Sequence, residues 1–306
     1  MIVISINGNF IRSAIAEVVP PSFKILKINE APLHKQFYQN VLSSNESKSE
    51  LKKVISESIK SLQSKNQDVL ISLDEKLVES QILKADSRQY EDKRSDYLTW
   101  YLNQRNGKME SEILHFYQEL GDSELGNHTT NIFCSSINGA ILESIKLSLN
   151  EVGCTPCWIE PNICSLSRVI MDKCKNKFAN FCGLIPEEWG FTMLSFQNGK
   201  LSAISKLSQM QKKWGLTSVM GDESFAMVCF NPLKGSMEHV EIEYIITGEM
   251  NKNHQTLFSG NNSKDKPEQV NPFDGIKFSG KKSSKVRNSS NCNNLLGLMM
   301  RGVGIA

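Results

Sequence analysis

Two cysteines, Cys154 and Cys157, have the spacing of a redox-active dithiol. In such a dithiol the start of a helix lowers the pKa of the first thiol. Here the order is reversed, because a helical pattern over 140–152 ends at Gly153 and a short strand is predicted from Cys157. The first thiol would therefore lie at the negative end of a helix dipole. We interpret both cysteines as core or loop thiols without redox chemistry.

The remaining cysteines and the histidines form no metal-binding pattern. A zinc site would have to add Cys164 and Cys174 to the first pair, but these two are too far apart in sequence and no histidine lies nearby. The five histidines, at positions 34, 115, 128, 239 and 254, are dispersed and open no catalytic signature. The Gly-x-Ser-x-Gly elbow of serine hydrolases does not occur. No metal is predicted.

Charge and hydropathy narrow the choice of partners. The chain has 35 basic and 33 acidic residues, a net charge of +2 that gives no field for recruiting nucleic acid. A basic cluster at 281–287 lacks interleaved aromatic residues and is interpreted as a solvated loop. The N-terminus does not resemble a signal peptide, and no apolar run of about 18 residues occurs. We expect a cytoplasmic chain with no direct membrane span.

Two similar hairpins are predicted to open two halves of the chain. The first is a strand, turn and strand over 2–18, with its turn at Asn7, Gly8 and Asn9. A strand at 23–28 and a helix at 46–65 follow. The second half begins at about 178, and its hairpin has strands at 192–196 and 201–207 around the turn Asn198-Gly199, after a strand at 181–184.

A separate unit is predicted within the first half, at 68–150. It comprises strands at 68–73, 77–84, 112–119 and 131–136 and helices at 92–104 and 140–152. A strand at 157–160 and a helix at 163–173 then return to the first sheet. In the second half a strand is expected at 240–247, poor order over most of 250–292, and a closing apolar helix at 293–302. No element is assigned to 214–238.

Four motifs occur in an order that resembles the actin-like superfamily and, more closely, the PilM family of type IV pilus assembly proteins. They are the hairpin ending Asn198-Gly199-Lys200-Leu201, the helix-strand-helix passage 141–169, Asn271-Pro272-Phe273, and the closing segment Gly297-Leu298-Met299-Met300-Arg301. The GspL component of type II secretion systems is similar as well. The resemblance implies an α/β fold with two actin-like, ribonuclease H-like domains.

The resemblance also implies the domain boundaries. The first domain would comprise 1–67 and 151–175, interrupted by an inserted α/β subdomain at 68–150 that binds a partner. The second domain would comprise 176–292, including the polar and partly disordered segment 250–292. Residues 293–306 would form the closing helix.

Actin-like ATPases hold the phosphates of Mg-ATP between two Asp-x-Gly hairpins, one from each domain. When the first hairpin is aligned so that Arg12 takes the place of the family's basic residue, Ser5 replaces the aspartate and Asn7 replaces the glycine. Gly8 follows one place late, before Asn9. The carboxylate that would organise the metal is missing from this hairpin.

The second hairpin and the adenine loop are altered too. Ile185 replaces the aspartate and Glu187 the glycine, with Pro186 between them removing an amide donor. Glu187 and Glu188 would put negative charge where phosphate belongs. In the adenine loop, Thr247 is followed by Gly248-Glu249 instead of paired glycines. We predict a non-catalytic protein without cofactor. The alternative left open is an active ATPase in which Glu187 or Glu188 organises the metal of Mg-ATP.

The resemblance implies a partner, the cytoplasmic peptide of a bitopic inner-membrane protein. In the family this peptide docks between the first domain and the insertion. We therefore predict a groove between the first sheet and the helix at 92–104, with Tyr97, Trp100 and Tyr101 as partner-binding residues, although core packing of Trp100 is an alternative. The protein would then act as a scaffold at the inner face of the inner membrane. Self-association into filaments remains an alternative.

Overall fold

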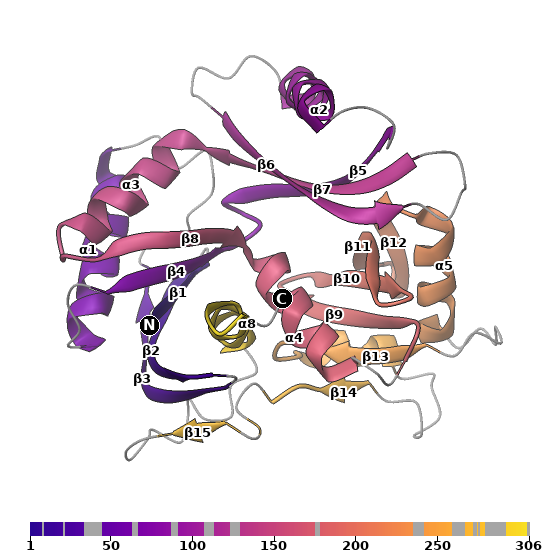
Figure 1. Cartoon of the computed structure of the whole chain (residues 1–306). Coiled ribbons are helices and arrows are strands. Elements are labelled where there is room, and N and C mark those ends of the chain that lie inside the picture. The colour runs from indigo at the N-terminus through magenta and orange to yellow at the C-terminus, as the bar shows by residue number, and fades with distance from the viewer. Residues whose placement is uncertain are drawn as a thin grey trace.

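A computed structural model of the chain describes residues 1–7, 9–20, 22–33, 45–62, 67–86, 91–106, 113–122, 129–174, 178–234, 242–258, 267–271, 274, 276–278 and 292–304. Figure 1 shows two sheets that face each other across a central pair of helices, with a smaller sheet above them. The sequence predictions that involve Gly8, Pro272, Phe273 and the basic cluster at 281–287 lie outside the described residues.

The first sheet contains the N-terminal hairpin and the parallel strands that follow it. Its order is β15-β3-β2-β1-β4-β8, in which β1 is antiparallel to β2 and parallel to β4. The strands are β1 (Ile2–Ile6), β2 (Phe10–Val19), β3 (Ser22–Pro32), β4 (Asp68–Leu73), β8 (Thr155–Pro161) and β15 (Lys277–Phe278). All five residues of β1 are buried, as expected for an unbroken apolar strand that is covered on both faces.

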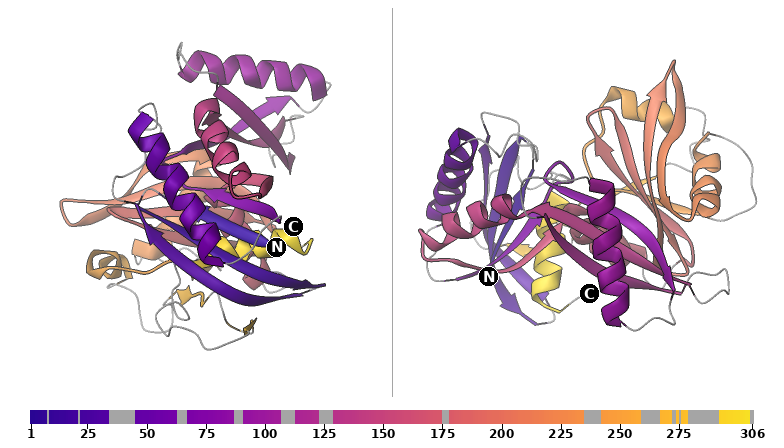
Figure 2. Two further views of the ribbon diagram at one scale, coloured as in Figure 1. Left: turned by 90° about the vertical axis from the view of Figure 1, so that its left-hand side faces the viewer. Right: turned by 90° about the horizontal axis from the view of Figure 1, so that it is seen from above.

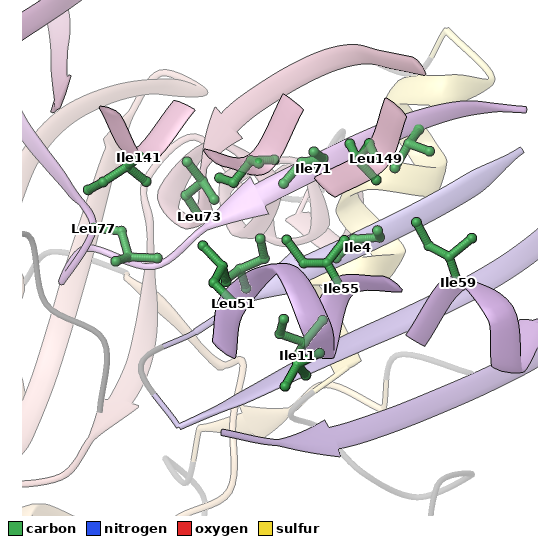
Figure 3. Close-up of a cluster of buried hydrophobic side chains, with 14 of the residues drawn as sticks. Ile4, Ile11, Leu51, Ile55, Ile59, Ile71, Leu73, Leu77, Ile141 and Leu149 are labelled. Atoms are coloured by element: carbon green, nitrogen blue, oxygen red, sulfur yellow. The ribbon is translucent and has the colours of Figure 1, made fainter. Parts of the chain in front are cut away.

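One face of this sheet is covered by α1 (Asn45–Leu62) and α3 (Gly139–Asn150). Leu51, Ile55 and Ile59 recur at helical spacing and point into the core, where they pack against Ile4 and Ile71 (Figure 3). The predicted apolar face of the helix at 46–65 is therefore confirmed.

The second sheet repeats this arrangement. Its order is β12-β11-β10-β9-β13-β14, with β9 antiparallel to β10 and parallel to β13. The strands are β9 (Phe181–Glu187), β10 (Gly190–Gln197), β11 (Lys200–Met210), β12 (Lys213–Gly221), β13 (Glu243–Ile246) and β14 (Glu268–Gln269). Its outer face packs against α5 (Glu223–Phe230), the 3-10 turns η2 (Asn231–Lys234) and η3 (Thr256–Phe258), and α6 (Lys252–Gln255). The predicted duplication into two similar sheets is confirmed.

Two helices lie between the sheets, α4 (Asn162–Cys174) and the closing helix α8 (Asn293–Gly302). Figure 2 shows α8 beside the first sheet, and α4 packs on the second. The helices touch at Gly297, where an added Cβ would lie 2.0 Å from the carbonyl oxygen of Ser165. Only glycine permits this approach.

The inserted unit is smaller than predicted. It is a three-stranded antiparallel sheet of order β5-β7-β6 with one helix, and its elements are β5 (Val78–Asp86), α2 (Glu91–Asn106), β6 (Ile113–Asp122) and β7 (Thr129–Asn138). The predicted range 68–150 also took in β4 and α3. The boundary needs correction, because β4 pairs with β1 and β8 in the first sheet and α3 packs with α1 on that sheet.

Three elements of the second domain, all close to 214–238, were not predicted from the sequence. The span 214–238 contains most of β12, followed by α5 and η2. The predicted strand at 240–247 is confirmed over Glu243–Ile246.

Among the helices of the described ranges, none is both long and apolar enough to cross a membrane.

Candidate functional site

The carboxyl ends of β1 and β4 lie side by side, the position at which α/β sheets place their ligands. There the amide of Asp74 donates a hydrogen bond to the carbonyl of Ile6, with the nitrogen 2.9 Å from the oxygen. This contact fixes Asp74 and Glu75 at the edge of the first domain that faces the second. Neither carboxylate was predicted from the sequence to have a role.

The side chain of Lys206 on β11, in the second domain, contacts the first domain. Its ammonium group donates to a carboxylate oxygen of Glu75, to Glu187 Oε1 at 2.7 Å, and to Thr192 Oγ1 at 2.6 Å. The Thr192 hydroxyl in turn donates to Glu187. We call Asp74, Glu75, Glu187, Thr192 and Lys206 the interdomain cluster.

Burial and charge act in opposite directions within the interdomain cluster. Burial raises the pKa values of Asp74 and Glu75 above those of ordinary carboxyl groups. Burial alone would lower the pKa of Lys206, but the carboxylates of Glu75 and Glu187 outweigh it and raise that pKa. Lys206 is therefore a cation at neutral pH, held by carboxylates from both domains.

The first hairpin uses its own amides internally. The Asn7 Oδ1 atom accepts hydrogen bonds from the backbone amides of Asn9, at 2.9 Å, and Phe10, at 3.1 Å. A nucleotide phosphate would have to displace the Asn7 side chain to reach these amides. Ser5 is buried on β1 and supplies no carboxylate, and Arg12 pairs with Glu30 on β3 at 2.6 Å. The structure thus places Ser5 and Arg12 on neighbouring strands of the first sheet, and the loss of nucleotide binding stays a prediction.

The second hairpin lies against the adenine loop. A Cβ on Gly248 would lie 2.8 Å from Cδ of Pro186, so the two segments are in close contact. Thr247 continues the pairing of β13 with β9 through a 3.0 Å bond from its amide to the Leu184 carbonyl. Ile185 is partly buried in the core beside it, while Glu188 and Glu249 are exposed.

The cleft residues described above do not fit a magnesium nucleotide. Pro186 has no amide to offer, the described amides of the first turn are bonded to Asn7, and Lys206 is already bonded to Glu75 and Glu187. Within the residues that the structure describes, no group of three or more His, Cys, Asp or Glu side chains is arranged to hold a metal ion.

The inserted unit adds an apolar contact across the domains. Ile82 of β5 and Phe133 of β7 belong to the same buried cluster as Ile204 of β11, with Met220 of β12 packed against it. A Cβ at Gly221 would lie 3.3 Å from Cδ1 of Ile82. The interdomain cluster is thus accompanied by an apolar contact between the insertion and the second domain.

The aromatic helix α2 lies elsewhere than predicted. Its Leu98 and Leu102 pack on the inserted sheet in a cluster with Ile132 and Cys134 of β7, while the other face of that sheet packs on the two-domain body (Figure 1). The expected groove between the first sheet and α2 is therefore absent, because the inserted sheet separates them.

The aromatic residues of α2 remain available at its surface. Tyr97 is 46% exposed and Trp100 is 58% exposed, with ring centroids 6.1 Å apart. Tyr101 is half-buried against the cluster beneath the helix. Core packing of Trp100, the alternative from the sequence, is excluded by this exposure.

Cys154 and Cys157 lie in different environments. Cys154 is buried and Cys157 is exposed, and all eight cysteines are free thiols. Burial raises the pKa of the Cys157 thiol, the opposite of the shift that activates a nucleophile.

No protein-family model and no curated protein matches the sequence. Solved structures match the fold. A chain of the PilM–PilN type IV pilus biogenesis complex matches with a TM-score of 0.65 at 12% identity, covering 99% of this chain and 98% of that chain. A Bacteroides thetaiotaomicron protein with an actin-like ATPase fold and unknown function matches with a TM-score of 0.52 at 13% identity, covering 96% and 94%.

The cytoplasmic domain of EpsL from the type II secretion system of Vibrio cholerae is a more distant match, with a TM-score of 0.44 at 6% identity, covering 99% of this chain and 93% of that chain. The two-domain topology and the higher-scoring matches define the class: this chain has the actin-like fold. The resemblance to the PilM family that was predicted from the sequence is confirmed at the level of the fold.

Proposed function

We propose that this protein is a non-catalytic actin-like scaffold of a type IV pilus-like or type II secretion-like envelope machine. It docks the cytoplasmic segment of a membrane-anchored partner, and through that partner it stays at the inner face of the inner membrane. It needs no ATP or magnesium.

The observation that carries the proposal is the hydrogen bonding of Lys206 to carboxylates of both domains. An ATPase cleft presents unpaired cations and backbone amides to phosphate. In this cleft the cation is neutralised, and three carboxylates, Asp74, Glu75 and Glu187, lie around it. A triphosphate would meet like charge without a metal site to offset it.

Two observations support a docked partner. The fold agrees with a chain of the PilM–PilN complex over nearly its whole length. The inserted unit also exposes Tyr97 and Trp100 beside each other on α2, and large aromatic residues are common anchors at interfaces. We propose this aromatic surface, in place of the absent groove, as the docking site.

The docking proposal is tested by tagging the full chain in its own host and measuring how much is recovered with the membrane fraction. Changing Tyr97 and Trp100 together to serine should reduce this recovery strongly without lowering stability. Chemical cross-linking in the wild type should capture a protein with a single membrane-spanning segment.

Phe116 provides a matched control. His115 and Tyr117 of β6 bond to Asn103 and Thr99 of α2, so Phe116, which is 51% exposed, points to the opposite face of the inserted sheet. Phe116→Ser should leave membrane recovery unchanged. Equal losses in both variants, or no loss in either, would contradict docking at the aromatic surface.

A further inference from the structure

The three donors of the Lys206 ammonium group are all used. A lysine ammonium has three N–H donors and no acceptor. In this structure they meet one oxygen each from Glu75, Glu187 and Thr192, with the last two at 2.7 and 2.6 Å. These oxygens come from three places in the chain: the turn after β4, the end of strand β9 and strand β10.

The surroundings of Lys206 hold it in place. Its neighbours on β11, Ser205 and Leu207, are buried, and so is Thr192 on the adjacent strand. Thr192 pairs with Lys206 in the β10–β11 register and also donates its hydroxyl proton to Glu187. An ordinary exposed ion pair joins two mobile side chains and contributes little. Here a buried threonine fixes the position of both charged partners.

We infer that the Lys206 ammonium is a tethered cation, which takes the position that an inorganic cation would need between the carboxylates of the two domains. Its oxygen partners, two carboxylates and a hydroxyl, are of the type that Ca²⁺ and Mg²⁺ prefer. Because this cation belongs to the chain, the two domains stay joined whatever the concentration of metal or nucleotide.

This inference deepens the scaffold proposal, but it concerns only the closure between the domains. Its test needs neither nucleotide nor partner. A negative result here would therefore not affect the membrane-recovery experiment. A negative result in that experiment would not affect this one.

The test replaces the tethered cation and supplies a free one. In Lys206→Met the carboxylates of Glu75 and Glu187 lose their counter-ion, and Ca²⁺ can bind between them. We expect the melting temperature of this variant to rise by about 2–4 °C in about 10 mM Ca²⁺ relative to EDTA. The wild type and Lys206→Arg should show no such rise, because both keep a side-chain cation.

Two controls separate this effect from general charge screening. Lys200→Met removes an exposed lysine from the same strand and should behave like the wild type. Adding Glu75→Gln to Lys206→Met should abolish the response to Ca²⁺. A Lys206→Met variant that is as insensitive to Ca²⁺ as the wild type would overturn the inference, as would a wild type that responds equally.

Discussion

Arg168 on α4 donates hydrogen bonds to both carboxylate oxygens of Glu160 on β8, and the two side chains are only 9% and 5% exposed. Ser165 also donates to Glu160, at 2.5 Å, and Arg168 reaches the carbonyl of Gly297 on α8 at 3.3 Å. One buried ion pair therefore connects the last strand of the first sheet to both central helices.

Replacing Arg168 with methionine should destabilise the protein by about 3–5 kcal/mol, because it leaves the Glu160 carboxylate buried without its counter-ion. Urea denaturation would measure the free energy of unfolding. Lys173→Met, at the end of the same helix, is the matched control and should have little effect. Adding Glu160→Gln to Arg168→Met should recover part of the loss, and a single variant as stable as the wild type would contradict this account of the central helices.

The contact between α4 and α8 predicts the effect of adding one methyl group. Gly297→Ala would place a Cβ 2.0 Å from the Ser165 carbonyl oxygen, so the helices must move apart, at a cost of roughly 1–3 kcal/mol. Gly215→Ala on β12 is the control, because a Cβ there would meet no atom within 4 Å. Thermal unfolding of both variants distinguishes them, and equal midpoints would show that the two helices are less tightly packed than described.

Asp74 predicts a pH dependence of stability. Because burial raises its pKa in the folded state, the contribution of this group is fully present below the ordinary value of 3.8 and is lost as the pH rises through the raised value. Asp74→Asn keeps the oxygen that accepts the Lys76 amide, at 2.9 Å, but carries no charge. The variant should therefore be more stable than the wild type at pH 7.

The difference between Asp74→Asn and the wild type should shrink as the pH falls toward 3.8. Denaturation curves between neutral and acidic pH would record it. Asp172→Asn, an exposed aspartate on α4, should show no comparable trend. A stability difference that widens toward acidic pH would mean that the sign assigned to the Asp74 shift is wrong.

The strongly patterned parts of the fold could be predicted from the sequence. Leu51, Ile55 and Ile59 gave a clear helical period, and Asn198-Gly199 gave a hairpin turn, where Asn198 and Gly199 both have positive φ. The α5 helix was missed, although Asp222 is its N-cap and accepts from the Phe225 amide at 3.0 Å. The available signal was an aspartate, a favoured N-cap residue, followed by Glu223 and an apolar stretch.

The interdomain cluster could be predicted only in part. Glu187 was identified as a carboxylate in the wrong place for phosphate, but its pairing with Lys206 depends on a contact between residues on different strands. Glu75 is separated from Lys206 by 131 positions, and no local period reports such a distance. The signal that could have indicated Asp74 and Glu75 is their place directly after an apolar strand at 68–73, where parallel strands present their carboxyl ends.

In the proposed scaffold the cleft keeps the actin-like architecture without the chemistry for a magnesium nucleotide. Calorimetric titration of Mg-ATP into the full chain is the decisive experiment. We predict no saturable heat and no phosphate release. Micromolar binding, followed by phosphate release that Glu187→Ala abolishes, would contradict the claim.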